Sequence, residues 1–184
     1  MLVLGASGFV GAQIKSYFAA KGNQVIGTYQ TENETYSQDD KMHFFQLEED
    51  NCRTLLIKLM PQVIIYCLRG EFDKQFAAIK EITKYIKENP SVRFIFLSTG
   101  NVFDGDQSCQ HIETDQVKAV SDYGKHKIMC EHWIQQELQG EGIILRLPTV
   151  YEKTCPRIER LKTLVGEKKG IDTISQVAIN LLKW

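Results

Sequence analysis

Six short apolar runs alternate with helical patterns along this chain, and no other feature of the sequence constrains the fold as strongly. Their content of Val, Ile, Leu and Phe is typical of strands that are buried on both faces. The runs lie at residues 2–4, 24–29, 43–47, 62–68, 92–99 and 143–147. Strands that alternate with helices pair in parallel and carry helices on both faces. The sequence therefore predicts an α/β fold, a Rossmann-type doubly wound parallel sheet.

Helices are predicted between these runs, where apolar residues recur every three or four positions. The first contains Val10, Ile14, Tyr17 and Phe18 on one stripe and is closed by Gly22. Others are expected at residues 51–60, 72–88 and 122–138. The 72–88 helix has an apolar stripe that either packs on the sheet or forms a dimer interface, so a homodimer is one possible assembly.

Composition and charge exclude several classes of partner. The chain has 184 residues, of which 43% are hydrophobic, and its net charge is −1. This balance provides no basic field for nucleic acid, and no apolar run is long enough to cross a bilayer. The start lacks the pattern of a signal peptide, and the five cysteines are scattered, so we expect a cytoplasmic protein with reduced thiols. The four histidines have no metal-site spacing, and no metal is expected.

A glycine-rich loop follows the first predicted strand and opens a helix. It reads Gly5-Ala6-Ser7-Gly8-Phe9-Val10-Gly11. Glycines at this place allow a tight turn and the close approach of a pyrophosphate, and the helix N-terminus attracts its negative charge. A bare turn without a ligand is the alternative. The strand-loop-helix context favours a dinucleotide site.

Three further residues could supply proton chemistry. Tyr123 and Lys127 are four residues apart on a predicted helix and so share one face. A neighbouring ammonium group favours the phenolate form of tyrosine, which can then exchange a proton with a carbonyl oxygen. Thr99 ends a predicted central strand, where its hydroxyl could hold that oxygen. Taken alone, Tyr123 and Lys127 are more typical of an ordinary surface tyrosine and a solvated lysine, and Thr99 with Ser98 could simply form a turn.

The order of glycine loop, strand-end threonine and Tyr-x-x-x-Lys resembles the extended short-chain dehydrogenase/reductase superfamily, whose loop spacing is also G-x-x-G-x-x-G. Within it, STGNVFDG at 98–105, LRLPTVYE at 145–152 and PQVIIYC at 61–67 are similar to dTDP-4-dehydrorhamnose reductases. The resemblance implies a Rossmann domain at 1–151 and a short remnant of the substrate-binding region at 152–184. The chain is then either truncated or a natural short form.

The resemblance also implies roles for individual residues. Thr99, Tyr123 and Lys127 would be catalytic, with Lys127 also holding the nicotinamide ribose. Residues that would contact the cofactor pyrophosphate are Gly5, Ser7, Gly8, Phe9, Val10 and Gly11. Arg69 could contact a phosphate of the cofactor, although a surface arginine is an equal alternative.

Several positions depart from the reductase pattern. Gly100 stands where those reductases have aspartate, which argues against a dehydratase. Tyr29 stands near the place where NAD-specific relatives have an acid, so NAD and NADP both remain open, with a lean to NADP. Leu47 replaces an aspartate that relatives place beside adenine.

The sequence leaves three functions open. One is an NAD(P)-dependent oxidoreductase that reduces a carbonyl group, with a nucleotide sugar as substrate. A second is a non-catalytic dinucleotide-binding or regulatory module of the same fold, and a third is a sugar-nucleotide epimerase.

Overall fold

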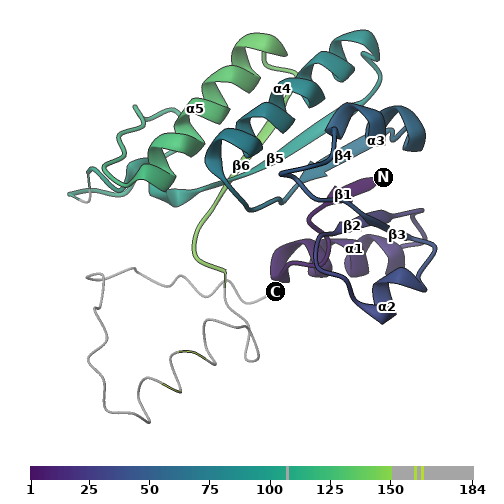
Figure 1. The fold of residues 1–184 in the computed structure, drawn as a ribbon. Helices are drawn as coiled ribbons and strands as arrows, with labels where there is room; N and C mark the ends of the chain where they lie inside the picture. The colour runs from purple at the N-terminus through teal and green to yellow at the C-terminus, as the bar shows by residue number, and fades with distance from the viewer. Residues whose placement is uncertain (107, 151–159, 161–162, 164–184) are drawn as a thin grey trace. The chain divides into compact units, whose positions relative to one another are not determined.

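The structure is a computed structural model that describes residues 1–106, 108–150, 160 and 163. Within these residues, six parallel strands form one sheet in the order β3-β2-β1-β4-β5-β6. The strands are β1 (Leu2–Leu4), β2 (Ile26–Tyr29), β3 (Met42–Phe44), β4 (Val63–Tyr66), β5 (Arg93–Thr99) and β6 (Ile143–Leu147). This arrangement confirms the predicted fold and places the switch of strand order between β1 and β4 (Figure 1).

Helices connect the strands close to their predicted positions. They are α1 (Phe9–Ala20), α2 (Glu34–Ser37), α3 (Cys52–Leu59), α4 (Phe72–Glu88) and α5 (Asp122–Glu137), with the 3-10 helix η1 (Gly100–Phe103) after β5. The short α2 and η1 were not predicted, because a single turn leaves too few residues for a periodic pattern. In both, a side chain accepts a hydrogen bond from the first turn: Asn33 caps α2 and Thr99 caps η1.

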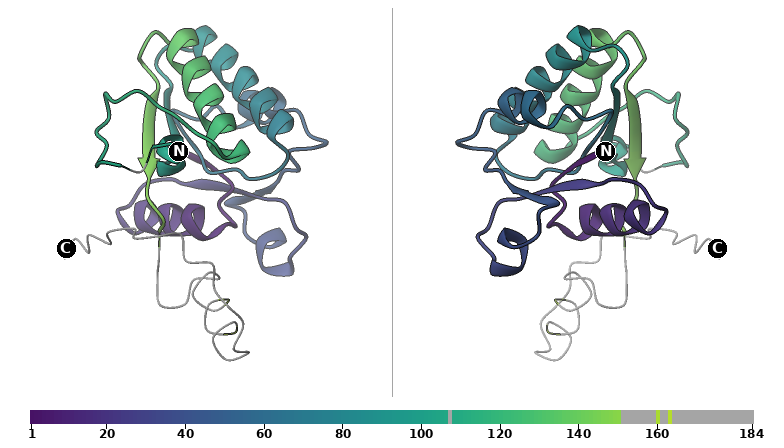
Figure 2. Two further views of the ribbon diagram at one scale, coloured as in Figure 1. Left: turned by 90° about the vertical axis from the view of Figure 1, so that its left-hand side faces the viewer. Right: turned by 90° about the vertical axis from the view of Figure 1, so that its right-hand side faces the viewer.

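The two faces of the sheet carry different helices, as Figures 1 and 2 show. On one face, α3, α4 and α5 pack through Leu56, Ile79, Ile82 and Ile134, which are fully buried. On the other face, α1 packs through Ile14 and Phe18. Successive strand residues point to opposite faces, so alternate positions of β1 and β4 belong to different core clusters.

The apolar stripe of α4 is used inside this unit. Ile79 and Ile82 have no exposed surface and Ile86 is 6% exposed. Burial of one such side chain contributes about 2 kcal/mol to stability. The stripe therefore packs on the sheet, and the homodimer stays a prediction. The predicted stripe of α1 is wrong at Tyr17, which is 60% exposed and meets the neighbouring Phe18 ring edge-on.

The chain divides into two compact units, Met1–Thr149 and Val150–Trp184. The first contains every element described above. Most of the second, including the predicted remnant of the substrate-binding region, lies outside the described residues, so the boundary predicted at residue 151 stays a prediction. Among the described residues, none of the helices has the length and apolar content needed to cross a membrane.

Candidate active site

The loop between β1 and α1 requires glycine at two positions. Gly5 has a φ of +84°, which other residues rarely adopt. A Cβ on Gly11 would lie 2.3 Å from the carbonyl oxygen of Gly5, so α1 packs directly against the loop. Thr28 of β2 holds the loop from the other side. Its hydroxyl accepts a hydrogen bond from the Gly5 N–H at 2.8 Å, and its carbonyl oxygen accepts one from the Ser7 N–H at 3.2 Å. Sequence analysis missed Thr28, whose signal is a hydroxyl within an otherwise apolar run.

The N-terminus of α1 is open to a negatively charged ligand. The helix begins after Gly8 without a side-chain cap from any described residue and without an acid in its first turn. By contrast, α2, α3 and α5 each begin with a side chain that accepts a hydrogen bond from the first turn, and α4, which has no such cap, carries Asp73 in its first turn. Ser7 and Gly8 are exposed, and Phe9 and Val10 are partly exposed. The free N–H groups and the positive end of the helix dipole therefore suit a phosphate.

The predicted catalytic residues come from two adjoining elements at the carboxyl end of β5. Tyr123 and Lys127 lie one turn apart on α5, with Lys127 Nζ 5.8 Å from the centroid of the Tyr123 ring. Thr99 is the last residue of β5, and its hydroxyl accepts a hydrogen bond from the Asn101 N–H at 3.2 Å. A Cβ on Gly124 would lie 2.5 Å from the carbonyl oxygen of Asn101, so the segment after Thr99 touches α5 beside Tyr123.

Lys127 is a buried cation. Its Nζ donates a hydrogen bond to the carbonyl oxygen of Leu97 at 3.2 Å and lies 4.5 Å from the centroid of the Phe96 ring. Burial, with a smaller contribution from the charge of Arg69, lowers the pKa of Lys127 to about 8. The group therefore remains largely an ammonium ion at neutral pH. A lysine in such a setting is typical of a functional site.

Two polar clusters position α5. Asp104 accepts hydrogen bonds from the hydroxyl of Ser121, the N-cap of α5, and from the N–H of the preceding residue at 2.6 Å. Further along the helix, Glu131 is 1% exposed, pairs with Arg146 of β6 at 2.8 Å and accepts a hydrogen bond from Ser98 at 2.5 Å. The hydroxyl of Ser98 is thus hydrogen bonded in the core. Thr99, the next residue of β5, points to the opposite face of the sheet.

Arg69 lies in the loop after β4 and is exposed. This loop touches the glycine loop, because a Cβ on Gly5 would lie 2.9 Å from the carbonyl oxygen of Cys67. A contact between Arg69 and a cofactor phosphate stays a prediction. Leu47, where the resemblance implies an acid beside adenine, is 5% exposed and belongs to the core.

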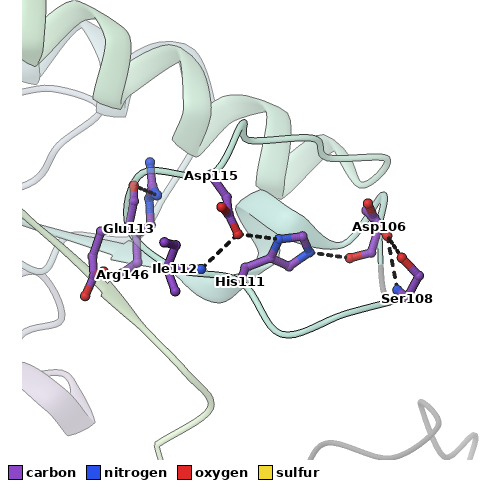
Figure 3. Close-up of polar contacts among 7 residues, drawn as sticks. All are labelled: Asp106, Ser108, His111, Ile112, Glu113, Asp115 and Arg146. Carbon is purple, nitrogen blue, oxygen red and sulfur yellow. Dashed lines mark hydrogen bonds and ion pairs between the residues drawn. The ribbon is translucent and has the colours of Figure 1, made fainter.

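The loop between η1 and α5 is fastened by His111, whose ring stacks on Phe103 with centroids 4.4 Å apart. Nδ1 lies 3.2 Å from Asp115 Oδ2, and Nε2 lies 2.7 Å from the carbonyl oxygen of Asp106 (Figure 3). The hydrogen bond to that carbonyl and the one to Asp115 raise the pKa of His111. Asp106, Cys109 and His111 also hold potential metal ligands within 4.8 Å of one another, a grouping that the histidine spacing did not predict. Since both ring nitrogens are hydrogen bonded, we assign these contacts to fastening the loop.

Two known proteins are similar to part of this chain in sequence. The Haloferax volcanii protein named "probable low-salt glycan biosynthesis reductase Agl14" is 24% identical over 161 residues, which cover 81% of this chain and 53% of that protein. The D-erythronate dehydrogenase of Haemophilus influenzae is 34% identical over 83 residues, 43% of this chain and 26% of that protein. The chain thus spans about half the length of the first relative and about a quarter of the length of the second.

Solved structures resemble the fold closely. A hypothetical dTDP-4-dehydrorhamnose reductase from Sulfolobus tokodaii has a TM-score of 0.68 and 23% identity, covering 82% of this chain and 56% of that one. The UDP-glucuronic acid 4-epimerase from Bacillus cereus, in complex with NAD, has a TM-score of 0.69 and 20% identity. This match covers 91% of this chain and 62% of the epimerase chain. Residues 1–163 match the model of the NAD dependent epimerase/dehydratase family, and the chain belongs to this family.

Proposed function

We propose that this chain is an NAD(P)-dependent oxidoreductase that reduces a carbonyl group, with a nucleotide sugar as substrate. The observation that carries the proposal is the buried ammonium group of Lys127 beside the ring of Tyr123, at the sheet edge that also bears the glycine loop. The relatives support the substrate class, because their names include a glycan biosynthesis reductase, a dTDP-4-dehydrorhamnose reductase and a UDP-glucuronic acid 4-epimerase.

The residues present fit a dinucleotide. The glycine loop is closely packed on both sides, and the first turn of α1 has no capping side chain from the described residues. The pyrophosphate would be held by Gly5, Ser7, Gly8, Phe9, Val10 and Gly11, with Arg69 near a phosphate and Lys127 at the nicotinamide ribose. When bound, the nicotinamide supplies the hydride.

The chain's own residues would manage the proton. Tyr123 is 38% exposed, so its phenol can reach a substrate and donate a proton to the carbonyl oxygen. The ammonium group of Lys127, 5.8 Å from the centroid of the Tyr123 ring, would stabilise the negative charge that develops on the phenol oxygen as the proton is transferred. The hydroxyl of Thr99 would orient the carbonyl, provided that it exchanges its present bond to Asn101 for one to the substrate.

The experiment compares Tyr123→Phe with wild type and with Tyr17→Phe, a matched change of an exposed tyrosine on α1. Binding of NADH and NADPH is followed by nicotinamide fluorescence, and turnover is followed with a panel of 4-keto nucleotide sugars. We expect Tyr123→Phe to keep cofactor affinity and lose turnover by at least 100-fold, the lower end of a general acid's contribution. Unchanged turnover in this variant would refute the assignment of Tyr123.

A non-catalytic dinucleotide-binding module is the second candidate. It is favoured by the Thr99 hydroxyl, which is already hydrogen bonded to its own turn. In that case cofactor binds saturably and no member of the panel is reduced. An epimerase would instead interconvert sugar epimers without net consumption of cofactor.

A further inference from the structure

An acidic side chain lies at the end of β2, although the sequence has none at that position. Rossmann folds use an acid near this point to bind the 2′-hydroxyl of the adenosine ribose. Here the strand ends at Tyr29 and is followed by Gln30. The amide of Gln30 donates a hydrogen bond at 3.0 Å to Oε2 of Glu48, which comes from the segment after β3.

The Glu48 carboxylate lies among the loops that follow β2, β3 and β4. A Cβ on Gly70, in the loop after β4, would lie 2.8 Å from Glu48 Oε1. The same loop touches the glycine loop at its other end, where the carbonyl oxygen of Cys67 lies 2.9 Å from a Cβ on Gly5. Only two residues separate Cys67 from Gly70, so Glu48 lies at the same edge of the sheet as the candidate pyrophosphate site.

The surroundings of Glu48 suit neutral hydroxyls better than a phosphate. Oε2 is bound by the Gln30 amide, while Oε1 faces the backbone of Gly70 and can accept a further hydrogen bond. The ammonium group of Lys74 donates its hydrogen bond to the backbone carbonyl of Glu48, at 3.2 Å. A 2′-phosphate would bring a second negative group toward the carboxylate, and like charges at close range repel.

We infer that Glu48, oriented by Gln30, is the acid that selects NAD over NADP. This inference rests on the proposed cofactor site. This reverses the lean to NADP that the sequence suggested, because that lean considered only the residues at the end of the second strand. The acid instead comes from the segment after β3, and the uncharged amide of Gln30 holds it near the end of β2.

The test is a fluorescence titration of the full chain with NADH and with NADPH, in wild type, Glu48→Gln and the matched control Glu49→Gln. We expect wild type to bind NADH at least tenfold more tightly than NADPH. Glu48→Gln should reduce this ratio at least tenfold, by weakening NADH and strengthening NADPH. Glu49→Gln changes the adjacent, exposed acid and should leave the ratio as it is.

A further variant, Gln30→Leu, removes the hydrogen bond to Glu48 and should lower the ratio to an intermediate value. Thermal unfolding of each variant verifies that it is folded. An unchanged ratio in folded Glu48→Gln, or a wild type that prefers NADPH, would overturn the inference and leave the proposed function standing. Failure of folded wild type to bind either nucleotide would overturn both.

Discussion

Replacing Lys127 by methionine should stabilise the fold while it removes the cation from the candidate site. Burial lowers the lysine pKa from 10.5 to about 8. At about 1.4 kcal/mol per pKa unit, the charged form costs about 3 kcal/mol relative to the neutral one. Methionine fills a similar volume without charge. Loss of the hydrogen bond to Leu97 and of the contact with Phe96 offsets part of this gain, which leaves about 1–2 kcal/mol at pH 7.

The gain should depend on pH in a definite direction. The folded state releases the Lys127 proton near pH 8, whereas the unfolded chain keeps it until about pH 10.5. The unfolded state therefore binds more protons between these values, and the contribution of Lys127 to stability rises with pH. The cost is fully present below pH 8 and disappears toward pH 10.5. The advantage of Lys127→Met should thus fall by about 2 kcal/mol between pH 7 and pH 9.5.

Urea unfolding at pH 7 and pH 9.5, followed by circular dichroism, measures both quantities. The control is Lys125→Met on the same helix, where an exposed ammonium group lies 3.7 Å from Asp122. Its effect should stay within about 0.5 kcal/mol at either pH. The reasoning is refuted if Lys127→Met is less stable than wild type at pH 7, or if its difference from wild type is equal at the two pH values.

Three further changes test other parts of the unit. Gly11→Ala would place a methyl group against the backbone of Gly5, so we expect a loss of about 1–3 kcal/mol in thermal unfolding together with loss of NADH binding. Arg146→Met leaves Glu131 buried without its cation, and urea unfolding at pH 7 should show a loss of about 3–5 kcal/mol. In thiol titration of the native protein, exposed Cys109 should react fastest among the described cysteines, and Cys109→Ser should remove that phase. An equally fast reaction of the buried cysteines would contradict it, since burial raises their pKa values to about 12.

The local pattern of the chain was sufficient to predict its fold. Apolar runs and helical periodicity located all six described strands and four of the helices, with α4 predicted from its first to its last residue. These elements are long enough for their period to be read, and burial of their apolar faces determines how they pack. The alternation of strand and helix then implied a parallel sheet, and the glycine spacing located the loop at its switch point.

Pairs that are distant in the sequence were decided by the tertiary structure alone. Thr28 holds the glycine loop across 23 positions, Gln30 meets Glu48 across 18, and Arg146 neutralises Glu131 across 15. No periodic pattern encodes such pairs, because each depends on which strands lie side by side and how their register aligns. The sequence by itself therefore predicted which residues could bind a dinucleotide and move a proton, and their roles stay predictions. The tertiary structure alone decided how deeply these residues are buried and which charged groups lie beside them. Both depend on which strands pair, because pairing brings the carboxyl ends of separate strands to one edge of the sheet.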